Sequence, residues 1–114
     1  MHELSIALGI LRVAEVEAKK ANAKSIERIE LEIGTLAGIE FEALDFVWPS
    51  AVKGTILEHT KREIIIINGK AQCVDCETIF ALDNHYDSCP KCKSNFKSII
   101  NGKELRVKSL EVSQ

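Results

Sequence analysis

The sequence predicts an α+β fold in which two helices and a sheet of about three strands are interrupted, before the last strand, by a small inserted module. Two observations lead to this expectation. Apolar residues recur at helical spacing near the N-terminus and at strand spacing further along, and all four cysteines fall within one stretch of 20 residues. The chain has 114 residues, of which 46% are hydrophobic, and this is enough for one domain with a real core.

Two segments are predicted to be helices. The first spans residues 3–21, because five apolar side chains recur at spacings of three and four and therefore share one face. These five are Leu4, Leu8, Leu11, Ala14 and Ala18. The second helix is expected from about residue 40 to residue 50, where it would bury Phe41, Leu44 and Trp48.

Three segments are predicted to be strands of the sheet. Over residues 29–33, isoleucine and leucine alternate with glutamate, which is typical of a strand buried on one face. Residues 64–67 are four isoleucines in a row, and this pattern predicts a central strand covered on both faces. The last strand is expected over 104–112. Gly34 and Gly38 are interpreted as turn glycines with unusual backbone angles.

Two Asn-Gly pairs mark the ends of the inserted module. Asn68-Gly69 and Asn101-Gly102 are both turn signals, and the cysteines lie between them. The chain is expected to leave the sheet at the first pair and to return at the second. The predicted domains are therefore residues 1–69 together with 103–114, and residues 70–102.

Charge and composition argue against several classes of protein. Lys and Arg total 15 against 17 Asp and Glu, a net charge of −2, whereas a protein that grips nucleic acid through bulk charge is clearly basic. The segment between Cys73 and Cys92 itself carries four acidic residues and one lysine. No apolar run approaches the roughly 20 residues of a membrane helix, and the N-terminus lacks the pattern of a secretory signal. We therefore expect a cytosolic, cytoplasmic protein without a nucleic-acid or membrane partner.

The cysteines form two Cys-x-x-Cys pairs, Cys73/Cys76 and Cys89/Cys92, separated by twelve residues. In a reducing cytosol such a set is far more typical of a metal site than of two disulfides. Each pair can turn two thiolates toward one ion, and together they supply the tetrahedral set that zinc prefers. Four thiolates leave no open position for water, so we expect a structural zinc and a zinc-ribbon domain. A rubredoxin-like iron site and a dithiol redox role are the alternatives.

The N-terminus carries a second set of metal donors. The Met1 amine, the His2 amide nitrogen and the His2 imidazole can close adjacent chelate rings around one ion, and either the Glu3 amide nitrogen or another side chain can complete a planar set. Square-planar nitrogen coordination favours Ni(II) or Cu(II), and zinc gains nothing from it. Taken alone, however, a histidine at position two is most often a solvated residue without a metal.

Three features of the chain together resemble a known family. They are the opening Met1-His2-Glu3-Leu4-Ser5, the Glu32-Ile33-Gly34 that ends the first predicted strand, and the four-cysteine module. In this order and at these offsets they resemble the HypA/HybF family of nickel metallochaperones, which serve NiFe-hydrogenase maturation and in some organisms urease. The resemblance spans essentially the whole chain. It implies an α+β fold with a small mixed three-stranded sheet, two helices and an inserted zinc-ribbon domain.

The resemblance also implies a function, which is that of a nickel metallochaperone and not of an enzyme. His2 resembles the essential nickel ligand, with the Met1 amine and the Glu3 backbone as co-ligands, and the Glu3 side chain is linked to partner binding and site geometry. Zn(II) is then structural and Ni(II) is transported. The implied partners are the GTPase HypB, the hydrogenase large-subunit precursor and urease accessory proteins, and the chain is expected to be a monomer or a dimer. We place the GTPase contact, as a hypothesis, on the outer face of the first helix near Glu15 and Glu17.

Other polar residues receive simpler interpretations. Some family members use a zinc-domain histidine as a further nickel ligand, but an exposed loop residue is the preferred interpretation of His85. His59 is expected to be solvated, and so are the carboxylates that flank Arg28, namely Glu27, Glu30 and Glu32. No catalytic constellation is visible in the sequence. The competing function is a zinc-ribbon adaptor without a nickel role, and a nucleic-acid-binding zinc ribbon is third.

Overall fold

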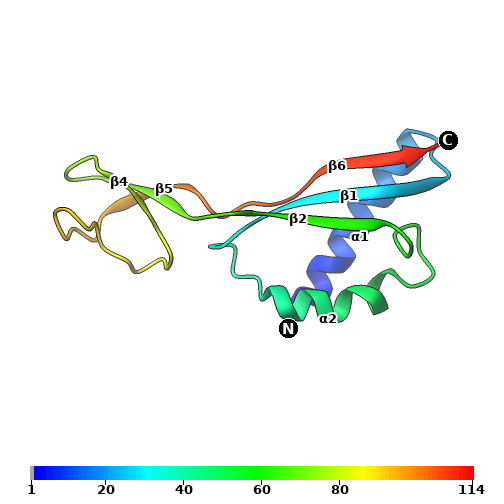
Figure 1. Ribbon diagram of the computed structural model, residues 1–114, viewed down its shortest axis with the longest axis horizontal. Helices are drawn as coiled ribbons and strands as arrows, with labels where there is room; N and C mark the ends of the chain where they lie inside the picture. Colours follow the sequence, from blue (N-terminus) through cyan, green and yellow to red (C-terminus); the bar gives the residue numbers. More distant parts are fainter. Residues whose placement is uncertain (1) are drawn as a thin grey trace. The chain divides into compact units, whose positions relative to one another are not determined.

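A computed structural model describes residues 2–114 and contains two helices and six strands. In chain order they are α1 (Glu3–Lys20), β1 (Ser25–Gly34), α2 (Phe41–Val52), β2 (Lys61–Ile67), β3 (Lys70–Cys73), β4 (Ile79–Ala81), β5 (Lys97–Asn101) and β6 (Leu105–Ser113) (Figure 1). The strands form two three-stranded sheets, ordered β2-β1-β6 and β4-β3-β5. The predicted α+β class, with its two helices and small sheet, is confirmed. Neither helix has the length and apolar character that a membrane crossing requires.

The chain divides into two compact units, and each is made of separate pieces of sequence. One unit, called here the helical unit, holds the residues up to Leu31 together with Ile39–Ile65 and Arg106–Gln114. The other, called the cysteine unit, holds Glu32–Gly38 and Ile66–Leu105.

The sheet of β2, β1 and β6 is mixed. At the start of β1, the hydroxyl of Thr60 just before β2 donates to the Ile26 carbonyl, and at its end the Thr35 N–H donates to Ile67. The start of β1 thus lies beside the start of β2, and the end of β1 lies beside the end of β2, so the two strands run parallel. The Lys24 N–H instead donates to the Ser113 carbonyl, so β6 runs antiparallel to β1.

The prediction that residues 64–67 form the central strand is wrong. β2 is an edge strand, and β1 is the central one. The isoleucines of β2 are only half-buried, and Ile66 is exposed. β1 looks half-exposed in sequence because one of its faces is charged, yet that face is covered by ion pairs instead of apolar side chains.

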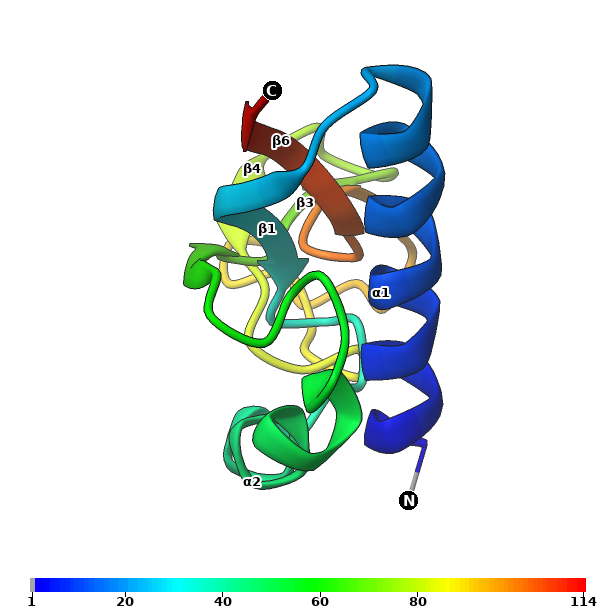
Figure 2. The same cartoon turned by 90° about the vertical axis from the view of Figure 1, so that its right-hand side faces the viewer.

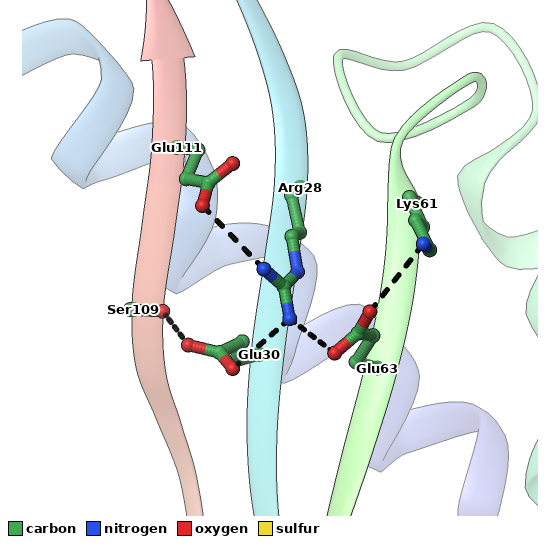
Figure 3. A network of polar contacts seen from close by, with 6 residues as sticks. All are labelled: Arg28, Glu30, Lys61, Glu63, Ser109 and Glu111. Carbon is green, nitrogen blue, oxygen red and sulfur yellow. Dashed lines mark hydrogen bonds and ion pairs between the residues drawn. The ribbon is translucent and has the colours of Figure 1, made fainter.

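A network of ion pairs covers the face of β1 that points away from α1 (Figure 3). Its centre is Arg28, whose guanidinium pairs with Glu63 of β2, with Glu30 at 3.3 Å and with Glu111 of β6 at 3.6 Å. The Ser109 hydroxyl donates to Glu30. The prediction that Glu30 is solvated is therefore wrong, because partners more than 30 residues away in sequence reach it and Arg28. Glu27 is exposed, as expected.

The buried face of α1 differs from the predicted one. Leu11, Ala14 and Ala18 are buried as expected, but Leu4 and Leu8 are 45% and 41% exposed. Their places are taken by Glu3, Ala7 and Ile10. Two apolar stripes overlap on this helix, and the one with more alanines faces the core because small side chains let the helix backbone approach its neighbours closely.

The second helix matches its prediction. Leu44 and Trp48 are buried in α2, and Phe41 is half-buried. The Arg62 guanidinium of β2 lies 5.0 Å from the centre of the Trp48 ring and pairs with Asp45. Figures 1 and 2 show α1 crossing one face of the sheet, with the start of α2 close to the start of α1.

The cysteine unit has its own small core. β3 pairs antiparallel with β4 and β5, which places Ala71 opposite Phe80 on one side and Ile99 on the other. The core comprises six buried residues: Leu36, Ala71, Cys73, Phe80, Leu82 and Cys89. Leu36 belongs to the loop that follows β1, so the first piece of this unit supplies a core residue to the second.

Three glycines let backbones of the cysteine unit pass close together. A Cβ atom on Gly34 would lie 1.8 Å from the carbonyl oxygen of Gly102, and one on Gly69 would lie 2.2 Å from that of Leu82. Gly102 and Gly38 have φ of +121° and +76°, in the region that favours glycine. The turn-glycine prediction therefore fits Gly38, whereas Gly34 is required for close packing and not for its backbone angle.

Candidate metal centre

The two Cys-x-x-Cys segments fold into matching knuckles. In each, the N–H of the first cysteine donates to the carbonyl five residues later, and its carbonyl accepts from the N–H four residues later. The pairs are Cys73 with Thr78 and Glu77, and Cys89 with Ser94 and Lys93, at 2.8 to 3.0 Å. These bonds hold the backbone in a tight turn that aims both sulfurs of a knuckle the same way.

Each knuckle ends on a residue with an unusual backbone conformation. Glu77 and Lys93 have φ of +65° and +66°, in the left-handed region where glycine is the usual residue. They occupy equivalent positions, one residue after Cys76 and Cys92. Because neither is glycine, no residue type marks this turn in the sequence, and the backbone hydrogen bonds hold the strained conformation in place.

The four sulfurs converge on one point. Each lies within 4.8 Å of the other three, and two of these distances join the knuckles, with 3.5 Å from Cys73 to Cys92 and 3.6 Å from Cys76 to Cys89. A tetrahedral zinc with Zn–S bonds of about 2.3 Å places its sulfurs about 3.8 Å apart. The four sites therefore fit such an ion, and all four cysteines are free of disulfides. Iron accepts the same donors.

The surroundings of Cys76 favour its thiolate. The side chain of Thr78 lies 3.2 Å from the sulfur, and hydrogen bonding from this side chain and from the Thr78 backbone lowers the pKa of Cys76 to about 6. Metals bind thiolates and not thiols, so Cys76 is the thiol that gives up its proton more readily. The backbone hydrogen bond with Ser94 lowers the pKa of Cys92, but Cys73, burial and the other two cysteines together raise it to about 12. Cys73 and Cys89 are buried, which limits access to the centre from solvent.

The start of α1 combines an exposed imidazole with a buried carboxylate. The His2 side chain is 58% exposed, whereas Glu3 is only 5% exposed. The Glu3 carboxylate accepts the N–H of Glu40, the residue that precedes α2, at 3.2 Å. This bond is the main reason that the pKa of Glu3 lies below its ordinary value. The same oxygen lies 3.6 Å from His2 Nε2. Met1, whose amine is an expected co-ligand, lies outside the described residues.

The other histidines lie in exposed loops. His85 is exposed, as expected, and its Nε2 lies 3.2 Å from the Leu36 carbonyl. His59 is also exposed, with Glu58 at 3.8 Å. Among residues 2–114, the group of three or more metal-binding side chains that comes together is the cysteine quartet.

Comparison with known proteins identifies the family. A family model described as "Hydrogenase/urease nickel incorporation, metallochaperone, hypA" matches residues 1–112. The chain belongs to the HypA family. The hydrogenase maturation factor HypA of Parabacteroides distasonis is 45% identical over 114 residues, covering all of this chain and 99% of that protein. That of Azotobacter vinelandii is 40% identical over 112 residues, covering 98% of this chain and 99% of that protein.

Solved structures of HypA proteins share the fold. The solution structure of the Ni metallochaperone HypA from Helicobacter pylori matches with a TM-score of 0.70 and 27% identity, covering 99% of this chain and 98% of that one. A second HypA solution structure matches with a TM-score of 0.68 and 29% identity, covering 98% and 96%. The resemblance to HypA that the sequence displays is thus confirmed, and with it the class of nickel-incorporation metallochaperone.

Proposed function

We propose that this chain carries Ni(II) on its N-terminal nitrogens and hands it on during hydrogenase maturation, while the four cysteines hold a structural zinc. Membership of a nickel-incorporation family supports the cargo. The proposed nickel ligands are the Met1 amine, the His2 amide and imidazole and the Glu3 backbone nitrogen. The proposed zinc ligands are Cys73, Cys76, Cys89 and Cys92.

The observation that carries the nickel proposal is the buried Glu3 carboxylate beside the exposed His2 ring. Only Nδ1 of an imidazole can close a six-membered chelate ring with the amide nitrogen of the same residue, so Nε2 has to point elsewhere. His2 Nε2 faces the Glu3 carboxylate at 3.6 Å, so the ring nitrogen that the chelate requires is the one farther from this carboxylate, Nδ1. A carboxylate that accepts from the second nitrogen of a ligating histidine orients the ring and raises its basicity.

Burial also determines what Glu3 does. Its carboxylate holds the first turn of α1 against the start of α2 through the Glu40 N–H, and it is not accessible to another protein. We therefore assign the Glu3 side chain to site geometry and not to partner contact. His2, by contrast, is accessible, as a site that must release its cargo requires.

The two metals suit different tasks. Four thiolates close the zinc site and would supply folding free energy to a unit with only six buried core residues. The His2 side chain is exposed, so an acceptor protein can reach nickel that this side chain binds. We assign nickel to the domain of residues 1–69 with 103–114 and zinc to residues 70–102. The proposed partners are the GTPase HypB, the hydrogenase large-subunit precursor and urease accessory proteins, in the cytoplasm.

A calorimetric Ni(II) titration of untagged, zinc-loaded protein tests the nickel site. Two changes should abolish tight binding, namely His2→Ala and a Gly-Ser extension before Met1, because one removes the imidazole and the other moves the free amine away. His59→Ala and His85→Ala are matched controls and should bind nickel as the parent does. Zinc content should stay at about one per chain in all five proteins.

Other outcomes would redirect the proposal. Equal binding by all five proteins would exclude the N-terminal site, and loss of binding in His85→Ala alone would move the nickel to the cysteine unit. Absence of nickel binding in the parent would leave a zinc-ribbon adaptor as the function.

A further inference from the structure

A groove runs along the free edge of the sheet in the helical unit. It has a volume of about 410 Å³ and lies between the second half of α1 and strand β6, which Figures 1 and 2 show side by side. Its walls are Val13 and Glu17 of α1, Ala21 directly after this helix, and five residues of β6: Val107, Lys108, Ser109, Leu110 and Val112. A second hollow of about 420 Å³, lined by Gly9, Arg12, Val13, Val16 and Glu17, continues it along α1. The two hollows share Val13 and Glu17 and are called here the edge groove.

The run of β6 residues shows which part of the strand faces the groove. Successive side chains of a strand point to opposite faces of the sheet. A hollow that touches Val107, Lys108, Ser109 and Leu110 in succession must therefore follow the edge of the strand, where its backbone groups lie. Among the described residues, β6 has β1 as its sheet neighbour on one side and forms the end of the sheet on the other. Such an edge is a template for a further strand.

The α1 wall is apolar and leaves room for another backbone. Val13 and Val16 are 48% and 49% exposed although they lie in the middle of a helix. Between them and the N-terminus stands Gly9, which costs a helix interior about 1 kcal/mol relative to alanine. A Cβ atom at Gly9 would meet nothing within 4 Å, so no contact inside the described chain requires glycine there. The helix thus presents a shallow apolar surface with a notch.

The rim of the groove is positive although the whole chain carries a net charge of −2. Arg12 and Lys108 line it, and its one carboxylate, Glu17, is already paired with Lys20 at 3.2 Å. A second copy of the chain is a poor match, because its own edge strand carries Arg106 and Lys108 against a single Glu111.

We propose that the edge groove binds an extended acidic segment of another protein, which adds to β6 as a fourth strand. Strand addition of this kind gains its affinity from main-chain hydrogen bonds and its specificity from alternate side chains. The side chains on the face toward α1 would be apolar at the centre, against Val13, Val16 and Leu110. Acidic side chains at the ends of that face would meet Arg12 and Lys108. The proposal is independent of both metal sites.

A symmetric peptide tests this recognition without assuming the direction in which the strand runs. The probe is a fluorescein-labelled, end-blocked heptapeptide of sequence Glu-Thr-Val-Thr-Val-Thr-Glu, and its counterpart carries lysine in place of both glutamates. Fluorescence anisotropy with the zinc-loaded full chain should give binding of the acidic peptide that weakens with salt. The lysine peptide should bind at least about tenfold more weakly. Hydrogen exchange of the complex should slow amides of β6.

Matched variants locate the site. Val13→Glu and Lys108→Glu should each weaken binding by about tenfold or more, whereas Leu8→Glu and Lys103→Glu should change it less than about twofold. Leu8 is 41% exposed on the same helix but does not line the groove. Circular dichroism and zinc content verify folding. If Val13→Glu does not fold, Lys108→Glu still tests the site, because it changes only an exposed side chain.

Several results would overturn the proposal. These are absence of binding, equal binding of the two peptides, equal losses in groove and control variants, or protection of amides outside β6. Sedimentation of the parent chain as a dimer that Val13→Glu dissociates would overturn it as well, because the groove would then hold a second copy.

Discussion

Shortening Leu82 to alanine should weaken zinc binding by a factor that follows from the size of the cysteine unit. Leu82 is fully buried in a core of only six residues, two of which are zinc-ligand candidates. Leu→Ala in a protein core costs about 2–5 kcal/mol, depending on how far neighbours move into the cavity. Because few neighbouring side chains can move into the cavity, we take a loss of about 3 kcal/mol in the folding free energy of the cysteine unit. Because folding of such a unit is coupled to metal binding, the loss appears as about 100-fold weaker apparent zinc affinity.

The assay is competition with a chromophoric zinc chelator at neutral pH. Leu57→Ala is the matched control, since Leu57 is also fully buried but belongs to the helical unit. It should lower the urea midpoint of the helical unit and leave zinc affinity within about threefold of the parent. Equal zinc affinities in Leu82→Ala and Leu57→Ala would refute the reasoning, because burial in the cysteine unit would then contribute nothing to metal binding.

The remaining predictions concern two glycines and one ion pair. Gly34→Ala should destabilise the protein by at least about 2 kcal/mol, because its Cβ would overlap the Gly102 carbonyl. Gly9→Ala should stabilise it by up to about 1 kcal/mol, since its Cβ meets nothing within 4 Å; thermal unfolding of both variants measures the difference in sign. The Arg28 guanidinium lowers the pKa of Glu63 below its ordinary 4.5, so the stabilisation it provides is present above that pH and is lost as pH falls through the lowered value. Glu63→Gln should therefore reduce the urea midpoint at pH 6, and its difference from the parent should shrink as pH falls below 4.5; a difference that stays constant over this range would count against this account.

Local patterns in the sequence predicted the secondary structure well. Spacings of three and four residues predict the helices, alternation predicts β1, and four consecutive isoleucines predict β2. The failures are long-range. The consecutive isoleucines of β2 predict a central strand, and the alternating glutamates of β1 predict a strand with one exposed face. No local pattern reports that Arg28 meets Glu63 and Glu111, which come from different strands.

The same distinction applies to the site. The cysteine spacing predicts that four sulfurs meet. The two cysteines of each pair are only three residues apart in sequence, and two such pairs supply all four ligands of one metal ion. The sequence did not reveal that Glu77 and Lys93 adopt left-handed backbone angles, since the residues that usually mark them are absent. It also did not reveal the buried Glu3 carboxylate, whose partner Glu40 lies 37 residues away. A carboxylate in the first turn of a helix looks solvated unless the second helix is placed beside it.

The cysteine unit is built from two separate pieces of sequence, and this limits how it can be exchanged between proteins by recombination. A gene fragment encoding the stretch between the two Asn-Gly pairs would carry every cysteine but would lack Leu36 from the core. It would also lose the Thr35 hydroxyl that accepts the Gly69 N–H at 3.0 Å. The segment between the two Asn-Gly pairs is therefore not a complete folding unit that could be moved into another protein. Recombination that exchanges it between relatives has to exchange the loop before α2 as well, or repair the mismatch by substitutions at both places.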